Sequence, residues 1–317
     1  MKNDLTSIII NTRNGHETIN RAIRSALNQS FTNTEIIVYD NGSSPPIKGI
    51  VEFNEPKLKF LRSEESLDLG EARNNAFIAS SGSYIVFLDD DDIMLPAKIK
   101  LCIEALQREK DVGMVYSDVY VFYEKYKKSY LEYSRKMPEG DLFELLIKGN
   151  FILWQSTFFK REALTYSKKP FPSKFNNITD FSLYLKIAKN WKIHYINFPL
   201  SIYVIHGGNY SINNNKASQE LIMLSNEAYF NNEEKSQLRN YANTKKISKL
   251  FESKSRKKLL SQIILLKSTK TKFRLLVGFF LSYIIDINNI RLILLKMKKN
   301  RYSEISNIIE LCQPRQD

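Results

Sequence analysis

The first half of the chain alternates between two apolar patterns, and this alternation restricts the fold more than any other feature. Between stretches in which apolar residues recur at helical spacing lie short runs of branched and aromatic residues, which are typical of buried strands. These runs are Leu5–Ile10, Glu35–Tyr39, Leu58–Leu61, Tyr84–Leu88 and Val112–Tyr116. Strands that alternate with helices predict an α/β fold, with a mostly parallel, Rossmann-like sheet covered by helices on both faces.

Polar side chains follow three of the predicted strands, at residues 11–14, 40–43 and 89–92. In sheets of this kind, ligands bind beyond the carboxyl ends of the strands, at the point where the strand order reverses. We therefore expect the three clusters to converge on one ligand-binding crevice.

Four consecutive aspartates, Asp89–Asp92, stand at the end of one predicted strand. Four like charges repel one another and cannot be buried unpaired. Hard divalent cations such as Mg²⁺ or Mn²⁺ prefer oxygen ligands and often bind through carboxylates together with substrate phosphates. The run therefore predicts a binding site for a divalent metal. The alternative is a solvated acidic turn before a helix whose start Pro96 indicates.

Composition narrows the class of protein. With 43% hydrophobic and 26% charged residues, the chain of 317 residues has the composition of a folded protein. Cys102 and Cys312 lie far apart, so no zinc spacing or disulfide framework is indicated and a reducing, cytoplasmic setting fits. We expect no secretory signal, and no apolar run reaches the ~18–20 residues that span a bilayer.

Positive charge is concentrated late in the chain. Residues 1–210 hold 27 Lys and Arg against 25 Asp and Glu, whereas residues 211–317 hold 20 against 9. Such a basic segment indicates a polyanionic partner surface, either nucleic acid or anionic lipid. From about residue 216 the pattern predicts only helices.

Residues 141–210, which follow the alternating first half, predict a mixed set of elements. In chain order they are a helix at Asp141–Lys148, a strand at Gln155–Phe159, a helix that starts near Asp180, and short strands at His194–Ile196 and Ser201–Val204.

Four separated blocks then stand out, at residues 25–31 (SALNQSF), 36–43 (IIVYDNGS), 70–92 (from GEARN to FLDDDD) and 179–188 (TDFSLYLKIA). In this order they resemble a family 2 glycosyltransferase of the glycosyltransferase-A fold, of the bacterial polysaccharide and O-antigen type, over roughly residues 4–210. The resemblance implies a catalytic domain at 1–215 and leaves 216–317 as a basic helical extension. It also implies inverting transfer of a hexose from a nucleoside-diphosphate sugar to a lipid-linked or polysaccharide acceptor.

The resemblance gives the aspartates unequal roles. Asp91 would hold Mn²⁺ or Mg²⁺, which as a Lewis acid stabilises the departing diphosphate. Asp89 would contact the ribose, and Asp90 would lie at the nucleotide sugar without binding the metal. Asp92 is expected to support the site or cap a helix. His206 would contact the metal or the diphosphate. The alternative is that His206 is an ordinary loop histidine with no role in the site.

Asp180 matches the family's general base, which would take the proton of the acceptor hydroxyl. The alternative from local sequence is a helix N-cap or first-turn acid, and the two roles are compatible. Thr179 stands where the family usually has glutamate, which removes one carboxylate from the acceptor side.

The remaining nucleotide-sugar contacts implied by the resemblance are Thr12, Arg13, Asn14, Asp40, Asn41 and Arg73. Asn41 replaces a usual aspartate, and its amide can pair with a uracil or thymine ring. Uridine is therefore preferred and a dTDP-rhamnose type of donor is the alternative, while a plain Asn-Gly turn explains Asn41 without a ligand. Arg73 would lie near the diphosphate, or would form a structural ion pair with the acidic cluster.

In the basic extension, apolar runs at residues 259–266, 275–285 and 290–295 are flanked by Lys and Arg. Helices of this kind suit the membrane interface, so we expect peripheral attachment to the anionic inner face of the cell membrane. The alternative is a helical subdomain or an interface with a second copy of the chain. Nucleic-acid binding would instead require basic and aromatic residues in the crevice, which is acidic here, so we expect no nucleic-acid partner.

Overall fold

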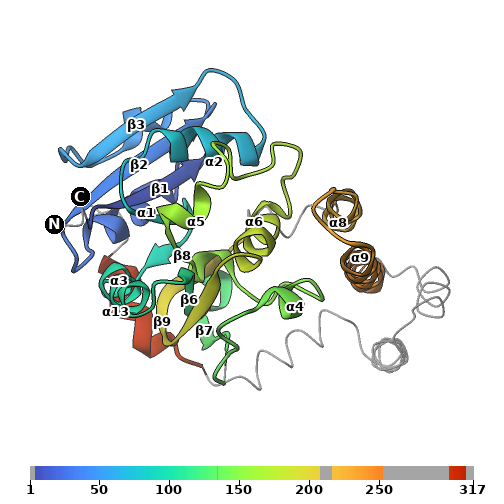
Figure 1. Cartoon of the computed structure of the whole chain (residues 1–317). Coiled ribbons are helices and arrows are strands. Elements are labelled where there is room, and N and C mark those ends of the chain that lie inside the picture. The colour runs from blue at the N-terminus through green and yellow to red at the C-terminus, as the bar shows by residue number, and fades with distance from the viewer. Residues whose placement is uncertain (1–3, 134, 208–215, 253–299, 312–317) are drawn as a thin grey trace. The chain divides into compact units, whose positions relative to one another are not determined.

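The computed structural model describes residues 4–133, 135–207, 216–252 and 300–311 (Figure 1). The chain divides into two compact units. The first comprises Met1–Phe143, Phe151–Asn209 and Asn300–Asp317, and the second comprises Glu144–Asn150 and Tyr210–Lys299.

The first unit is built on a nine-stranded sheet with the order β3-β2-β1-β4-β8-β6-β9-β5, and β7 pairs with β6 beside this path. The strands are β1 (Thr6–Thr12), β2 (Thr34–Asn41), β3 (Leu58–Ser63), β4 (Tyr84–Asp89), β5 (Ile93–Met94), β6 (Val112–Tyr123), β7 (Lys128–Leu131), β8 (Phe158–Lys160) and β9 (Lys192–Ile205). The first four predicted strands pair in parallel, and β8 then runs antiparallel between β4 and β6. The α/β fold is confirmed, with a parallel first half and a mixed second half.

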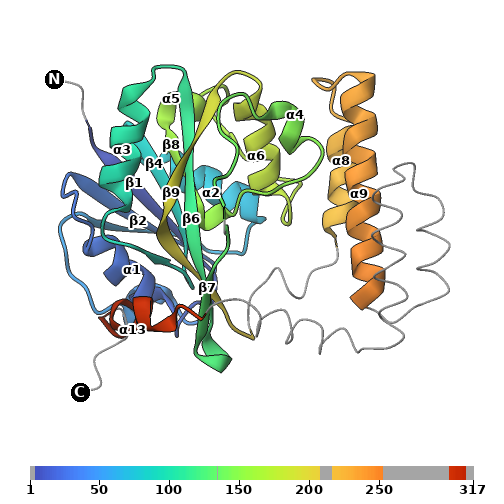
Figure 2. The same cartoon turned by 90° about the horizontal axis from the view of Figure 1, so that it is seen from below.

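Helices cover both faces of this sheet, as Figure 2 shows for α1 and α3 on one side and α2 and α6 on the other. The α-helices of the first unit are α1 (Ile19–Leu27), α2 (Leu69–Ile78), α3 (Lys98–Arg108), α5 (Arg161–Leu164), α6 (Thr179–Ala188) and α13 (Tyr302–Leu311). Short 3₁₀ helices η1 (Ile47–Ile50), η2 (Glu124–Tyr126) and η3 (Trp154–Ser156) join the strands. The apolar stripes of α1 and α3 pack on the isoleucines and valines of β1, β2 and β4, because both surfaces bury the same kind of side chain.

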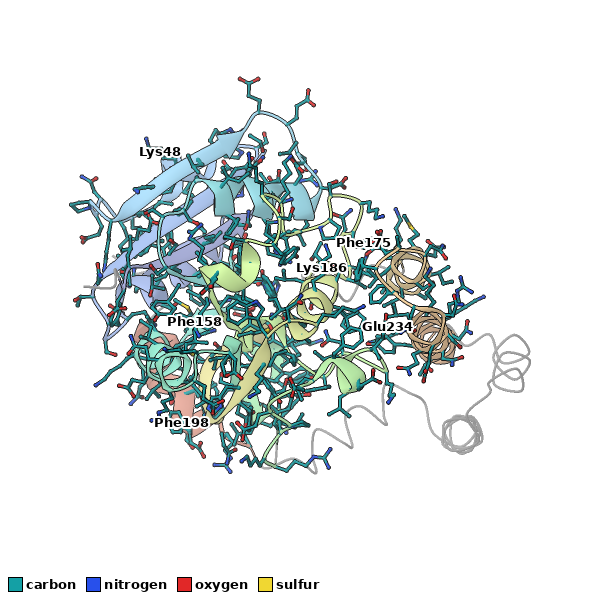
Figure 3. The ribbon with its side chains drawn as sticks, in the orientation of Figure 1. Lys48, Phe158, Phe175, Lys186, Phe198 and Glu234 are labelled. Atoms are coloured by element: carbon teal, nitrogen blue, oxygen red, sulfur yellow. The ribbon has the colours of Figure 1, made fainter. Side chains whose placement is uncertain are left out.

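Two predicted elements differ from the structure. The strand expected at Gln155–Phe159 is split into η3 and the shorter β8, because the Ser156 and Thr157 hydroxyls donate to the carbonyl oxygens three residues earlier and favour a turn. The two strands expected at 194–196 and 201–204 are one strand, β9, which pairs in parallel with β6 across register shifts near Asp118. Along these strands Phe158 is fully buried, whereas Phe198 is 55% exposed at the rim (Figure 3).

The described residues after 216 are helical, as predicted. Helices α8 (Ala217–Ser225) and α9 (Asn232–Glu252) belong to the second unit, and α4 (Phe143–Leu146) begins at its boundary. Helix α13 packs in the first unit. The division into a catalytic domain at 1–215 and a basic extension at 216–317 stays a prediction. The apolar runs at 259–266, 275–285 and 290–295 lie outside the described residues. Among the helices that the structure describes, none is long and apolar enough to cross a membrane.

Candidate active site at the strand ends

The three polar clusters meet where the sequence predicts. The parallel registers pair Thr12 with Asp40 and Asn11 with Asp89, so the carboxyl ends of β1, β2 and β4 lie side by side. The point of convergence lies where the strand order reverses, since β1 is flanked by β2 on one side and by β4 on the other.

Three of the four aspartates gather around one point. Asp89, Asp91 and Asp92 each offer a carboxylate oxygen, and these oxygens lie within 4.8 Å of one another. His206, which directly follows β9, has its Nε2 atom 2.9 Å from the Asp91 Oδ2 atom. Partial burial, and then the charges of Asp91 and Asp180, raise the pKa of Asp89 to about 6 against the opposing effect of Arg73.

Asp92 is fully buried, and its environment differs from the expected helix cap. The following helix, α3, begins only at Lys98. The Asp92 Oδ1 atom instead accepts a hydrogen bond of 2.8 Å from the Val204 amide, whereas its Oδ2 atom is buried and has no hydrogen-bond partner among the residues that the structure describes. Burial, together with the charges of Asp91 and Asp89, raises the pKa of Asp92 well above its ordinary value. A buried carboxylate that lies beside two further carboxylates fits a divalent cation with oxygen ligands.

Asp90 stands apart from that group. Its Oδ2 atom accepts a hydrogen bond from the Thr12 hydroxyl, which ties the end of β4 to the end of β1. Burial, and then the neighbouring charges of Asp91 and Asp89, raise the pKa of Asp90 to about 7. Gly15 is packed against this pair, because a Cβ atom there would collide with the Asp90 carboxylate and lie 2.6 Å from the Thr12 hydroxyl oxygen.

The loop after β2 is held by its own side chains. Asp40 is buried and accepts hydrogen bonds from the Ser43 and Ile47 amides at 2.9 and 3.1 Å, and from Arg62. Burial opposes its ionisation, but these hydrogen bonds outweigh burial and lower the pKa of Asp40. Asn41 pairs with both backbone groups of Leu67, donating at 2.9 Å and accepting at 2.8 Å. Contact of Asp40 or Asn41 with a nucleotide base stays a prediction.

Arg13 and Asn14 are exposed beside this loop. Asn14 has a φ of 58°, in the left-handed region, and its amide donates to the Ser43 hydroxyl at 2.8 Å. The Ser44 amide donates back to the Asn14 side chain at 3.0 Å, so the loops after β1 and β2 form one rim.

Arg73 of α2 links the acidic cluster to α6. Its guanidinium donates to the Thr179 hydroxyl at 2.8 Å and to Asp89 at 3.3 Å, and it lies over the Trp154 ring at 4.2 Å. The structural ion pair considered for Arg73 is therefore present, and the side chain is almost fully buried. Asp180 lies in the first turn of α6, where the N-cap position belongs to Ile178, so the first-turn alternative is confirmed and the N-cap alternative is wrong.

Two buried cations at the site were not expected. Arg21 of α1 donates to the Asp91 backbone carbonyl at 2.7 Å and pairs with Glu124 at 3.0 Å. Lys98 is 1% exposed, and its ammonium donates to the Gln155 carbonyl and, at 2.9 Å, to the Ser201 hydroxyl. Burial lowers the pKa of Lys98 to about 8, and the charge of Asp92 acts against that shift. The sequence did carry a signal for Lys98, which shares one helical face with Cys102 and Ala105.

Known proteins resemble this chain in sequence. The model of "Glycosyl transferase family 2" matches residues 7–187, more than half of the chain. A UDP-Glc:alpha-D-GlcNAc-diphosphoundecaprenol beta-1,3-glucosyltransferase of Escherichia coli, WfgD, is 29% identical over 198 residues, which are 62% of this chain and 75% of that relative.

Solved structures show the same fold. TarS of S. aureus (residues 1–349, in complex with UDP-GlcNAc) matches with a TM-score of 0.60 at 17% identity, over 86% of this chain and 80% of that one. The mannosyltransferase PcManGT of Pyrobaculum calidifontis, in complex with GDP-Man and Mn²⁺, matches with a TM-score of 0.59 at 15% identity, over 97% and 84%. The chain belongs to glycosyl transferase family 2 and is a glycosyltransferase with the glycosyltransferase-A fold.

Proposed function

We propose that this glycosyltransferase moves a hexose from a UDP-sugar to a lipid-linked saccharide in bacterial surface polysaccharide synthesis, with inversion at the anomeric carbon and with a divalent metal. One observation carries the proposal: Arg73 joins Asp89, in the acidic cluster, to Thr179, the neighbour of Asp180. A cation site and a carboxylate suited to act as a base thus belong to one connected group. The relative WfgD, named for UDP-Glc and a diphosphoundecaprenol acceptor, supports the donor and acceptor classes.

The metal would be Mn²⁺ or Mg²⁺, held by Asp91, Asp92 and His206. When bound, it would supply Lewis-acid stabilisation of the diphosphate leaving group. Asp89 would accept hydrogen bonds from the ribose, and Arg73 favours the ionised form of that carboxyl. A neutral His206 is required for such a role, and the nearby Asp91 carboxylate can orient its ring.

Asp180 would act as the general base. Its carboxylate would take the proton from the acceptor hydroxyl while that oxygen attacks the anomeric carbon, opposite the bond that breaks to the diphosphate. Attack from the opposite face gives inversion. The first-turn position favours a negative charge, because the helix N-terminus carries partial positive charge. Arg73 would position this turn through Thr179.

The nucleotide would lie along the rim formed by the loops after β1 and β2. Asp40 and Asn41 hold that rim in place through their backbone partners, and the exposed Arg13 offers a guanidinium suited to a diphosphate. Thr12, bonded to Asp90, and Asn14 would complete the sugar-nucleotide side.

The acceptor class implies work at a membrane, so we also propose peripheral attachment at the cytoplasmic face through the basic residues after 253. Deleting residues 256–317 would remove these basic residues, but it would also remove α13 from the first unit. A cleaner test replaces Arg256, Lys257 and Lys258 by glutamine and measures sedimentation with anionic vesicles. Unchanged sedimentation would refute this attachment, and a dimer in solution at the same residues would support the alternative interface.

The experiment that tests the proposed function compares UDP- and dTDP-sugars for Mn²⁺-dependent hydrolysis in the intact chain. We expect UDP-sugars to be hydrolysed, Asp91→Asn to abolish the reaction, and Asp90→Asn to retain most of it as the matched control. Hydrolysis that persists in Asp91→Asn or with a chelator would refute the metal role. Exclusive use of dTDP-sugars would replace UDP as the donor class.

A further inference from the structure

The described C-terminal helix α13 covers the back of the proposed metal site. Ile305 and Ile309 are 0% and 3% exposed, and they pack in one apolar cluster with residues of β5, β6 and β9. The other buried members of this cluster are Ile93, Leu95, Phe122, Ile202 and Val204.

The proposed metal ligands directly flank the two strands under α13. Ile93 directly follows Asp92, and Val204 stands two residues before His206. β5 contains only Ile93–Met94 and is held by its antiparallel pairing with β9. The Val204 amide of β9 also donates to Asp92, so the ligand that precedes β5 is bonded to the strand that leads to His206.

A second set of contacts fixes the start of α13. The Arg301 amide donates to the Ser129 carbonyl at 2.7 Å, and the Ser129 amide donates to the Asn300 side chain at 3.2 Å. The Tyr302 ring stacks on Phe122, with ring centroids 5.5 Å apart. The helix is thus held at its beginning by β7 and β6 and at its apolar face by β5 and β9.

We propose that α13 is a positioning element for the metal ligands, which keeps β5 and β9 in the arrangement that brings His206 to Asp91. This inference rests on the metal site of the proposed function. A strand pair of two residues has little stability of its own, so it depends on the apolar contacts behind it. Loss of those contacts would let the distance between His206 and Asp91 change, and groups behind first ligands affect metal affinity strongly.

The test measures Mn²⁺ binding by the full chain, with free Mn²⁺ counted from its electron paramagnetic resonance signal. The variant is Ile305→Ala with Ile309→Ala, and we expect affinity to fall about 10-fold, in the range seen when supporting partners of metal ligands are removed. The matched control is Ile103→Ala with Leu164→Ala, which also removes two buried aliphatic side chains but from α3 and α5. Urea unfolding of both variants shows whether their losses of stability are similar.

A milder variant keeps the test decisive if the double alanine variant fails to fold. Tyr302→Ala removes only the ring stacked on Phe122, and Ile305→Val with Ile309→Val should restore most of the Mn²⁺ affinity. Equal Mn²⁺ affinity in the α13 variants and the unsubstituted chain would overturn the inference, as would an equal loss in the control. Failure of the unsubstituted chain to bind Mn²⁺ would instead overturn the metal site itself.

Discussion

Arg73→Lys tests whether the guanidinium geometry, and not only its charge, joins the two halves of the site. A lysine ammonium cannot reproduce a planar fork that bonds Thr179 and Asp89 while stacking on Trp154. Losing one charge-assisted hydrogen bond costs about 1.5–3 kcal/mol, and losing the stacking adds roughly 0.5–1 kcal/mol. Because the Asp89 side chain is 34% exposed, solvent screens that ion pair, and we expect a total of about 2 kcal/mol.

The assay is urea unfolding, followed as a double-mutant cycle. Arg73→Met should cost about 3 kcal/mol, near the lower end for a broken buried pair. Combining it with Thr179→Val should cost less than the sum of the two single changes, by about 0.5–1.5 kcal/mol, since the variants remove the same hydrogen bond. Donor hydrolysis should fall in Arg73→Lys as well. Additive costs, or an Arg73→Lys variant as stable as the unsubstituted chain, would refute the bridging role.

Three further predictions concern the loops around the site. Gly15→Ala should lower stability in thermal unfolding by about 1–3 kcal/mol and reduce donor binding, because its Cβ atom displaces the Thr12–Asp90 pair. Gly49→Ala, whose Cβ atom would meet no atom of the described residues within 4 Å, should be neutral in the same assay. Asn41→Asp should destabilise the chain by about 1–3 kcal/mol, since a carboxylate oxygen would then face the Leu67 carbonyl at 2.9 Å; unchanged urea midpoints would contradict this. For Glu35, burial opposes ionisation, but hydrogen bonds from Lys59, Ser81 and Ser7 lower its pKa to about 2, so the stability it adds is present above about pH 4.5 and is lost as the pH falls toward 2. Glu35→Gln should flatten the stability profile in that window, and an unaltered profile would show that Glu35 is not its source.

Local sequence was sufficient to predict the crevice, but it was insufficient to predict the buried contacts that hold the crevice in place. The convergence of Thr12, Asp40 and Asp89 could be predicted because carboxyl ends of parallel strands share one edge of a sheet. The role of Asp92 could not, since its partner Val204 lies 112 residues away and depends on how β9 pairs with β5. No helical periodicity marks Arg21 as buried, because it lies opposite the apolar stripe of α1.

The error at Gln155–Phe159 has a local cause. Branched and aromatic residues there favour a strand, but Ser156 and Thr157 bond to the preceding backbone and turn the chain first. In the predicted basic extension, Ile305 and Ile309 are spaced for one helical face, and through them α13 packs on the sheet.

If α13 positions the metal ligands as proposed, its late place in the chain also implies an order in which the protein becomes active during synthesis. The contact between Ser129 and Asn300 spans 171 residues, and that between Tyr120 and Glu304 spans 184. All strands of the sheet leave the ribosome before α13 does, and closing so long a loop is slower than forming the local βα units. A nascent chain arrested before residue 300 should therefore fold its sheet, as measured by protease resistance, yet bind Mn²⁺ weakly until the last helix is released.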